Sequence, residues 1–389
     1  MICRGGPPWP PAFLELSEMH KTGGHGEPPL QKVTMFEKIA GNERVKEVLK
    51  RIFAAGRLPG ALLFVGEEGI GKKLFALEVA RALNCRTPTA DGPCGTCSAC
   101  TRISKINYPE TAEGSDEWKQ ILWTDHPDVG IVVPPKRVLL VTQMRQIESE
   151  ANYRPFEGKA RLFLIDEADK LNDPSANALL KILEEPPPTS HIILITSRPA
   201  MLLETIRSRC QMIRFSPLTP AEIEEYLLQN KVADRNSAGL LARVANGSIG
   251  RALSGDLETF KEQREAMFSV LKALSGKPDE AQLLRASEEL NEAQYKDEFE
   301  ERLDVLETLI RDTWMLSLKG SRDQLINADM FEELDKLSRQ INPDRAADWI
   351  LQVEDLREQL IVNVNRKIAA DGLFVSMAAP VAPPRKYLP

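Results

Sequence analysis

Short apolar runs alternate with helix-like segments along the first half of this chain. The runs predict buried strands, and the segments between them carry apolar residues every three or four positions, as amphipathic helices do. Strands that alternate with helices form a parallel sheet covered on both faces. The pattern therefore predicts one α/β domain over about residues 35–217. We expect its strands at residues 61–65, 129–133, 162–165 and 192–195, and its helices at residues 43–53, 72–83, 141–151 and 175–183.

The second half of the chain shows helical periodicity alone. Pro217 and Pro220 interrupt the pattern, and Thr219 can cap a helix that begins at Pro220. Short helices are expected over residues 218–255, and longer ones over residues 256–375. Two apolar stripes on the longer helices predict a packing core rather than a cofactor site: Leu303, Leu306, Ile310 and Trp314 form one, and Trp349, Val353, Leu356, Leu360 and Val364 form the other.

The composition and the chain ends limit the possible functions. Of 389 residues, 42% are hydrophobic and 28% charged, which is typical of a globular protein with two or three domains. No apolar run reaches the roughly 20 residues of a membrane span. Residues 1–34 lack periodicity and are expected to be a disordered extension, or to lie upstream of a true start at Met35. Residues 376–389 are rich in proline and are expected to be disordered. The net charge of −7 argues against a free-standing nucleic-acid binder, so any DNA contact should be local or shared with partner subunits.

A glycine-rich loop follows the first predicted strand. Gly66, Gly69, Gly71 and Lys72 have the spacing of a P-loop, in the strand–loop–helix context that this motif requires. Backbone amides of such a loop cradle phosphate oxygens, and the lysine neutralises their charge. Lys73 stands where a serine or threonine normally ligates magnesium. A cation there competes with the metal, so we expect weak or absent ATP turnover, while nucleotide binding by the loop stays open.

The predicted strand at residues 162–165 ends in two carboxylates, as a Walker B strand does. Asp166 could hold a metal ion and Glu167 could polarise water, because both follow a buried strand. An acidic surface turn is the alternative. If magnesium cannot be held from the side of Lys73, the two carboxylates are retained only as scaffold. The chain thus has the frame of an ATPase without the full chemistry.

Four cysteines lie within sixteen residues of one another. Cys85, Cys94, Cys97 and Cys100 form the pattern C-x8-C-x2-C-x2-C, which lets four sulfurs converge on one ion. Two disulfides or four free thiols are the alternative, which the lack of a secretion signal disfavours. Four thiolates leave no open coordination position, so we expect a structural zinc ion rather than a catalytic one.

Motifs spread over most of the first 255 residues form a characteristic set. Besides the glycine loop and the cysteine module, the set includes residues 58–64, His126-Pro127-Asp128-Val129, Pro155-Phe156-Glu157-Gly158-Lys159, residues 177–187 and Thr205-Ile206-Arg207-Ser208-Arg209-Cys210. Together these motifs closely resemble the bacterial sliding-clamp loader, a family of AAA+ proteins. Within it, the chain is most similar to the delta-prime subunits of DNA polymerase III. The helical remainder resembles the family only by position.

The resemblance implies roles for individual residues. In this family the arginine of the Ser-Arg-Cys signature reaches into the neighbouring subunit's nucleotide site, so Arg209 is implied as an arginine finger acting in trans. Ser197 stands at the position of the first sensor, where a small polar residue contacts phosphate or lytic water. Gly250 stands where the motor subunits carry the second-sensor arginine, and Arg251 is displaced by one residue. Cys210 is expected to be a buried packing residue.

The fold that the resemblance implies has three parts: an AAA+ domain with a zinc module at residues 85–100, a helical lid over residues 218–255 and a helical collar over residues 256–375. We expect a delta-prime stator that helps to load the sliding clamp onto primed DNA and supplies Arg209 to a neighbouring ATPase subunit. Its partners would be the gamma or tau and delta subunits in a hetero-pentamer, the clamp and primer-template DNA, in the bacterial cytoplasm and away from membranes. Polymerisation would belong to another subunit of the holoenzyme. The alternatives are an ATP-hydrolysing gamma or tau motor subunit, and a zinc-containing DNA-binding scaffold with a relic nucleotide fold.

Overall fold

The computed structural model describes most of the chain as two compact units. One unit ends at Ser254 and the other begins at Gly255. The extension predicted over residues 1–34 lies outside the described residues, as do residues 380–389 of the predicted tail. The described residues are 35–56, 58–89, 92–106, 109, 115–275, 280–290, 298–361 and 365–379.

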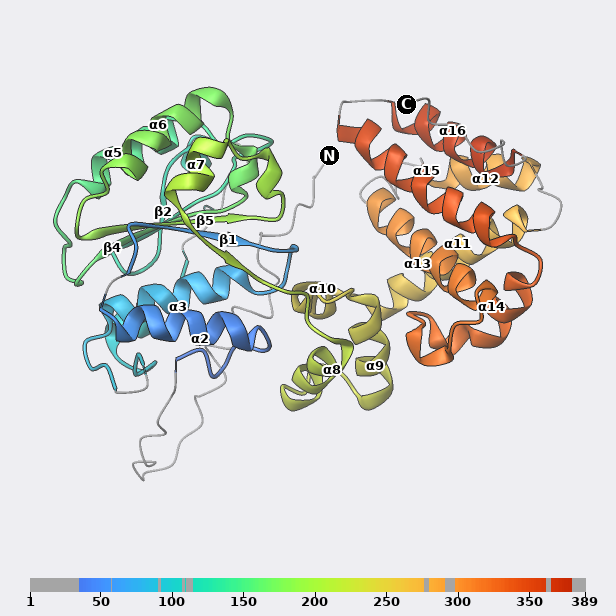
Figure 1. Cartoon of the computed structure of the whole chain (residues 1–389), viewed down its shortest axis with the longest axis horizontal. Helices are drawn as coiled ribbons and strands as arrows, with labels where there is room; N and C mark the ends of the chain where they lie inside the picture. Colours follow the sequence, from blue (N-terminus) through green and yellow to red (C-terminus); the bar gives the residue numbers. More distant parts are fainter. Residues whose placement is uncertain are drawn as a thin grey trace. The chain divides into compact units, whose positions relative to one another are not determined.

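A six-stranded sheet forms the centre of the first unit (Figure 1). Its strands are β1 Ala61–Val65, β2 Leu122–Trp123, β3 Val129–Val132, β4 Arg161–Ile165, β5 Ser190–Thr196 and β6 Gln211–Arg214. They lie in the order β2-β3-β4-β5-β1-β6, and every neighbouring pair is parallel except β2 and β3. The four strands expected from the apolar runs are confirmed, with ends that shift by at most two residues.

Helices cover both faces of this sheet. Figure 1 shows α2 (Glu43–Ala54) and α3 (Lys72–Asn84) on one face, and α5 (Val141–Ala151) and α6 (Asp173–Glu184) on the other. Successive side chains of β4 alternate between the two cores: Leu162 and Leu164 pack with α2 and α3, whereas Phe163 and Ile165 pack with α5 and α6. Because both faces are covered, every residue of β1 and β4 is buried, and both strands are mainly apolar.

The sheet is not wholly parallel, because β2 runs antiparallel to β3 at one edge. The polar stretch over residues 107–125, where no periodicity is visible, contains this strand and a 3₁₀ turn at Glu117–Lys119. A strand of two residues is too short to show alternation, so the pattern does not reveal it. The buried Gln143 holds the region in place, since its side-chain amide donates to the carbonyl oxygens of Trp118 (3.2 Å) and Val133 (2.9 Å). Residues 107–108 and 110–114 lie outside the described part.

Three short helices complete the first unit: α8 Pro220–Gln229, α9 Arg235–Val244 and α10 Ile249–Ser254. Thr219 caps α8 as predicted, because its hydroxyl accepts a hydrogen bond from the backbone N–H of Glu222 (3.3 Å). Apolar residues of all three helices, among them Ile223, Ala238 and Ile249, share a core with Ile70 of the glycine loop. The segment expected to be a lid is therefore packed beside the loop that it would cover.

The second unit is helical in its described residues and has its own core. Its helices are α11 Leu257–Leu274, α12 Glu280–Leu290, α13 Phe299–Ser317, α14 Phe331–Ser338, α15 Pro343–Ile361 and α16 Arg366–Ala378. The two predicted stripes line this core, except for Val364, which is not among the described residues. Helix α16 continues to Ala378, past the predicted start of the tail. Within the described part, no helix combines the length and the apolar character that crossing a bilayer requires.

Candidate functional site

The glycine loop joins β1 to α3 at the carboxyl edge of the sheet. Gly69 and Gly71 have positive φ angles of 74° and 96°, which residues with a Cβ rarely adopt. Gly66 starts the loop beside β5, since its N–H donates to the carbonyl oxygen of Thr196 (3.2 Å). Ser197, at the predicted first-sensor position, directly follows Thr196 and is exposed. The loop thus has the tight glycine turns that a phosphate cradle requires, and Ser197 lies next to it in the chain.

Lys72 is folded back onto this loop. Its side chain is buried, and its Nζ donates to the carbonyl oxygens of Gly66 (2.6 Å) and Glu67 (2.5 Å). Burial lowers the pKa of Lys72, although Asp166 and nearby glutamates act in the opposite direction. The ammonium therefore bonds to the loop itself at the place where it would meet phosphate oxygens.

Lys73 forms an ion pair with the Walker B residue Asp166. The side chain of Asp166 is 6% exposed and that of Lys73 is 24% exposed, so the pair is largely shielded from water. Asp166 is the carboxylate that would hold a metal ion, and Lys73 replaces the hydroxyl that would ligate the same ion. The lysine ammonium therefore supplies, from within the chain, the positive charge that the metal would bring.

Glu167 is also neutralised by a lysine of this chain. It forms an ion pair with Lys170, and its backbone φ of 47° places it in the left-handed region. Burial raises the pKa of Glu167, and its pairing with Lys170 opposes that shift. Next to it, Asp169 accepts a hydrogen bond from the hydroxyl of Thr196 (2.6 Å). The sequence motif does not reveal the pairing of Glu167 with Lys170.

The start of α10 lies directly against the glycine loop. The N–H of Gly250 donates to the carbonyl oxygen of Gly69 (2.9 Å). A Cβ at position 250 would stand 3.0 Å from the Cα of Gly69, and a Cβ on Gly69 would stand 2.2 Å from the hydroxyl of Ser248. Gly69 and Gly250 thus permit this close contact, and the side chain of an arginine at position 250 would force the loop and α10 apart. Arg251, the displaced basic residue, is exposed.

Arg209 lies at the other edge of the sheet. It ends α7 (Glu204–Arg209) just before β6 begins, whereas the glycine loop follows the end of β1. Strands β1 and β6 are parallel neighbours, with Leu62 opposite Gln211 and Val65 opposite Arg214. A strand of four residues spans roughly 13 Å. The structure thus separates Arg209 from the other predicted nucleotide-site residues of its own chain.

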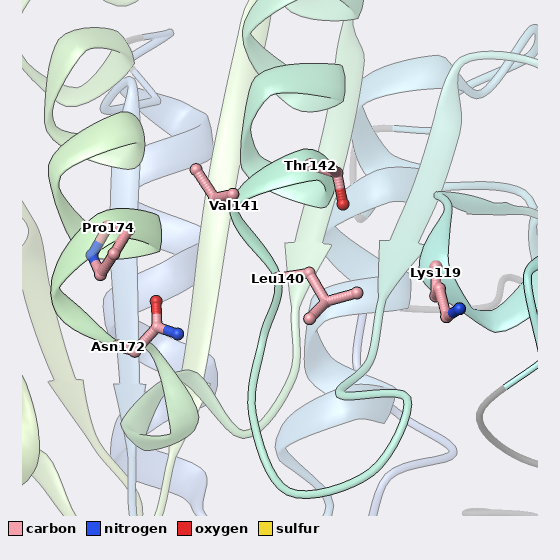
Figure 2. Close-up of a pocket in the computed structure, with 6 residues that line it drawn as sticks. All are labelled: Lys119, Leu140, Val141, Thr142, Asn172 and Pro174. Carbon is pink, nitrogen blue, oxygen red and sulfur yellow. The ribbon is translucent and has the colours of Figure 1, made fainter.

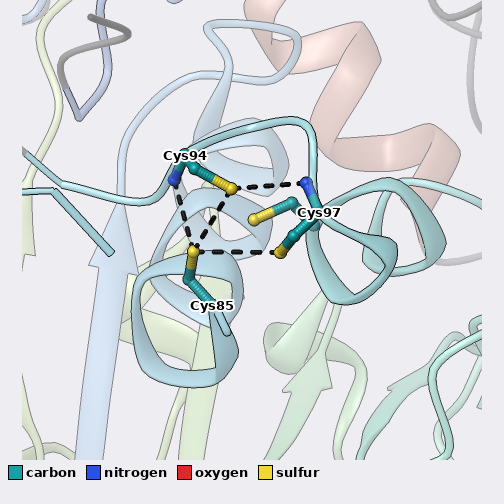
Figure 3. Close-up of side chains that lie close together, drawn as sticks. Cys85, Cys94 and Cys97 are labelled. Carbon is teal, nitrogen blue, oxygen red and sulfur yellow. Dashed lines mark hydrogen bonds between the residues drawn. The ribbon is translucent and has the colours of Figure 1, made fainter. Parts of the chain in front are cut away.

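The four cysteine sulfurs converge beyond the end of α3. Their Sγ atoms all lie within 4.8 Å of one another. Figure 3 shows Cys85 facing Cys94 and Cys97, with Sγ–Sγ distances of 3.6 Å and 3.9 Å. Backbone N–H groups of Cys94 and Cys97 donate to the sulfurs of Cys85 and Cys94, each at 3.3 Å. None of the described cysteines forms a disulfide. This set of soft donors fits a tetrahedral zinc ion.

Cys210, in contrast, is 9% exposed and packs in the core on the α5 and α6 face. Burial raises the pKa of its thiol to about 12. It is a packing residue, as expected, and lies apart from the four-cysteine cluster.

Comparisons with known proteins identify the family. The family described as "DNA polymerase III, delta subunit" matches residues 41–219, and its C-terminal counterpart matches residues 258–373. The DNA polymerase III subunit delta' of Bacillus subtilis is 30% identical over 322 residues, which are 83% of this chain and 92% of that protein. The chain belongs to the delta-prime family of DNA polymerase III subunits. The chain has an α/β domain with a mostly parallel sheet and a glycine-rich loop, a helical C-terminal part and a four-cysteine cluster that could hold a metal ion such as zinc.

Two further relatives bear on the place of the chain within the polymerase. Subunit delta' of Escherichia coli is 29% identical over 332 residues, which are 85% of this chain and 92% of that protein. Subunit tau of the same organism is 31% identical over 264 residues, which are 66% of this chain but 38% of that protein. The delta-prime relatives therefore match along nearly their whole length, and the tau relative over less than half of its own.

The buried Asp128 organises the loop that precedes β4. The side chain of Asp128 is fully buried and accepts hydrogen bonds from three consecutive backbone N–H groups, those of Phe156 (2.7 Å), Glu157 (3.0 Å) and Gly158 (2.8 Å). The side-chain oxygen of Asn84 accepts from the next two, at 2.8 Å and 3.1 Å. Five successive amides of the loop before β4 are thus held by two side chains.

Glu157 of this loop binds the cysteine module. Its carboxylate pairs with Arg86 (3.0 Å), which follows Cys85, and with Arg102 of α4 (Ser98–Ile103), the helix that carries Cys100. The buried His126 lies 3.5 Å from the same carboxylate, and burial lowers the pKa of His126. The motifs at residues 126–129 and 155–159 therefore attach the four-cysteine module to the sheet, which the sequence does not reveal.

A pocket of about 500 Å³ opens between the first turns of α5 and α6. Figure 2 shows Leu140, Val141 and Thr142 on one side, Asn172 and Pro174 on another, and Lys119 at the margin. The first backbone N–H groups of a helix have no partner within the helix and carry partial positive charge. Sequence patterns do not indicate this pocket, because it is formed by two helix starts more than thirty residues apart.

Proposed function

We propose that this chain is the delta-prime stator of the DNA polymerase III clamp loader, and that it supplies Arg209 in trans to a neighbouring ATPase subunit. The proposal rests first on the ion pair between Lys73 and Asp166. Hydrolysis of ATP needs a metal ion that bridges the phosphates, held by a P-loop hydroxyl and a Walker B carboxylate. Here the hydroxyl is absent and the carboxylate is paired with an ammonium group. This arrangement supports a subunit with little or no turnover of its own.

The surroundings of this ion pair point the same way. Glu167, the residue that would polarise water, is engaged by Lys170. Gly250 leaves the second sensor without a side chain and brings the backbone of α10 to the glycine loop. The loop keeps the shape of a phosphate cradle, so loss of hydrolysis does not require loss of nucleotide binding.

The position and the chemistry of Arg209 support its role as a finger in trans. It lies at the sheet edge opposite to its own glycine loop and is 37% exposed. A guanidinium keeps its charge at all physiological pH values and offers a planar fork of donors to phosphate oxygens. In a neighbouring motor subunit it would stabilise charge that develops on the transferred phosphoryl group.

The remaining parts of the chain fit a loader subunit. The helical second unit would act as the collar that joins the gamma or tau and delta subunits into a hetero-pentamer. The four-cysteine module would hold a zinc ion that stabilises structure, since four thiolates exclude substrate from the metal. Ser197 would serve as a remnant of the first sensor. We place the assembly at the replication fork in the bacterial cytoplasm, where it would load the sliding clamp.

Contact with primer-template DNA would come from the pocket at the starts of α5 and α6. Helix N-termini attract phosphate groups, and Lys119 lines this pocket while Lys136 and Arg137 lie in the segment that leads to α5. The overall charge of −7 makes such a contact dependent on the assembly.

A motor subunit of the gamma or tau type is the rival, because the tau relative is as similar per residue as the delta-prime relatives. Lys73 and its pairing with Asp166 oppose that alternative. A zinc-containing DNA-binding scaffold with a relic nucleotide fold would bind DNA as an isolated chain, in a salt-dependent manner.

Steady-state ATP hydrolysis by the reconstituted loader tests the proposal. The motor and delta subunits are combined with the wild-type chain, with Arg209→Ala, or with Arg235→Ala as a control for loss of an exposed arginine. We expect no turnover by the chain alone. In the assembly with clamp and primed DNA, Arg209→Ala should lower the rate of ATP hydrolysis at the neighbouring subunit's site about 10³-fold or more. Arg235→Ala should not lower turnover. Hydrolysis by the isolated chain, or an unchanged rate with Arg209→Ala, would refute the proposal.

A further inference from the structure

Arg209 is held by two acceptors of its own chain. Its Nη2 lies 3.0 Å from Oε1 of Glu184, and its Nη1 donates to the carbonyl oxygen of Thr205 at 3.0 Å. The side chain of Glu184 is 53% exposed. The guanidinium thus rests on the surface in a defined place, with two of its donors occupied.

The partner carboxylate is well placed for this contact. Glu184 is the last residue of α6, where the end of the helix adds partial negative charge. Glu185, which precedes Pro186, has few backbone conformations available, so the chain directly after Glu184 is restricted. The helix fixes the backbone of Glu184, and its side chain reaches across to the end of α7.

We propose that Glu184 holds Arg209 in a resting position, and that the finger leaves this carboxylate each time it enters the neighbouring subunit's site. This inference rests on the proposed function, because it concerns the same arginine. Glu184 is on this account a positioning residue, which sets how large a fraction of the fingers is free to engage.

The strength of the contact suits such a role. Ion pairs as exposed as this one contribute little stabilising free energy, since water screens the charges and two side chains lose conformational freedom. A terminal phosphate carries more charge than one carboxylate and offers several acceptor oxygens. The phosphate of a neighbouring nucleotide can therefore displace Glu184, whereas without such a ligand the resting contact prevails.

Basal ATP hydrolysis by the complete loader, without clamp or DNA, tests this inference. Glu184→Gln keeps the size of the side chain and removes its charge, so more fingers should be free, and the basal rate should rise about 1.5- to 5-fold. Glu184→Asp keeps the charge on a shorter side chain and should remain nearer the wild-type rate. Glu185→Gln is the matched control, since it neutralises the adjacent exposed carboxylate and should leave the rate unchanged.

A double variant separates this inference from the proposed function. If Glu184 acts through Arg209, then Glu184→Gln should have no effect when Arg209→Ala is also present. An unchanged or lower basal rate with Glu184→Gln, or a rise that persists in the double variant, overturns the resting contact. Either result leaves the trans finger intact as long as Arg209→Ala alone lowers turnover. If Arg209→Ala alone has no effect, the proposed function fails and the inference fails with it.

Discussion

Replacing Asp128 by asparagine should destabilise the first unit by about 3 kcal/mol. The carboxylate accepts from Phe156 through Oδ1 and from Glu157 and Gly158 through Oδ2. Asparagine has one oxygen, so at least one N–H loses its acceptor and faces an amino group instead. A hydrogen bond to a charged group contributes roughly 1.5–3 kcal/mol, and the two that remain weaken because the acceptor is no longer ionised.

Urea and thermal unfolding, followed by circular dichroism, measure this loss. For a unit of this size, 3 kcal/mol corresponds to a fall in Tm of roughly 6–12 °C. The zinc content should be measured in the same samples, because Asp128 supports the loop that carries Glu157 and through it the proposed zinc module. Asp125→Asn is the control, since it makes the same chemical change at an exposed position nearby.

The outcome is decisive because the two variants differ only in burial and bonding. A surface substitution without specific contacts changes stability by about 0.5 kcal/mol or less. If the unfolding free energy of Asp128→Asn lies within about 0.5 kcal/mol of the wild-type value, the carboxylate does not hold the loop as its hydrogen bonds indicate.

Two further predictions concern the charges around the glycine loop and the histidines His126 and His191. Lys73→Thr restores the metal-ligating hydroxyl and frees Asp166 from its ion pair. Magnesium should therefore strengthen nucleotide binding to the variant and not to the wild-type chain. Calorimetric titrations that show no such difference would contradict the competition between the lysine ammonium and the metal ion. Burial lowers the pKa of both His126 and His191. The unfolded chain takes up protons from about pH 6.5 downward while the folded chain does not until lower pH, so the unfolding free energy should be retained above pH 6.5 and fall below it. His191→Gln should flatten this decline between pH 7 and pH 5 in urea titrations, and an unchanged slope would assign the decline to other groups.

The central strands were predictable because their physical cause lies within each segment. A strand buried on both faces consists mainly of apolar residues. Strand β1 is apolar throughout and β4 is apolar after its first residue, Arg161, so each is visible as an apolar run in the sequence. The cysteine cluster is visible for a similar reason, since three of its four ligands lie within seven residues. Strand β2 is not visible, because two residues cannot show a period.

The pairings that define the site depend on distant parts of the chain. The absence of a hydroxyl at position 73 is a local fact, but its consequence depends on Asp166, which is 93 residues away. The resting contact of Arg209 with Glu184 and the contact of Gly250 with Gly69 are of the same kind. Sequence reasoning can name these residues from motifs, but only the folded chain shows which of them neutralise one another.

The two edges of the sheet give this chain two sites that can change independently. Lys73 and Asp166 belong to the carboxyl edge, and Arg209 and Glu184 belong to the amino edge, with the length of a strand between them. Effects of substitutions at such separations normally add, because the sites share no partners. On the proposed function, a loss of hydrolysis at one edge therefore need not disturb the proposed finger at the other. A chain with an inactive glycine loop can keep an effective arginine for its neighbour. Lys73 then stabilises the fold, because without it the buried carboxylate of Asp166 would lack this ion pair.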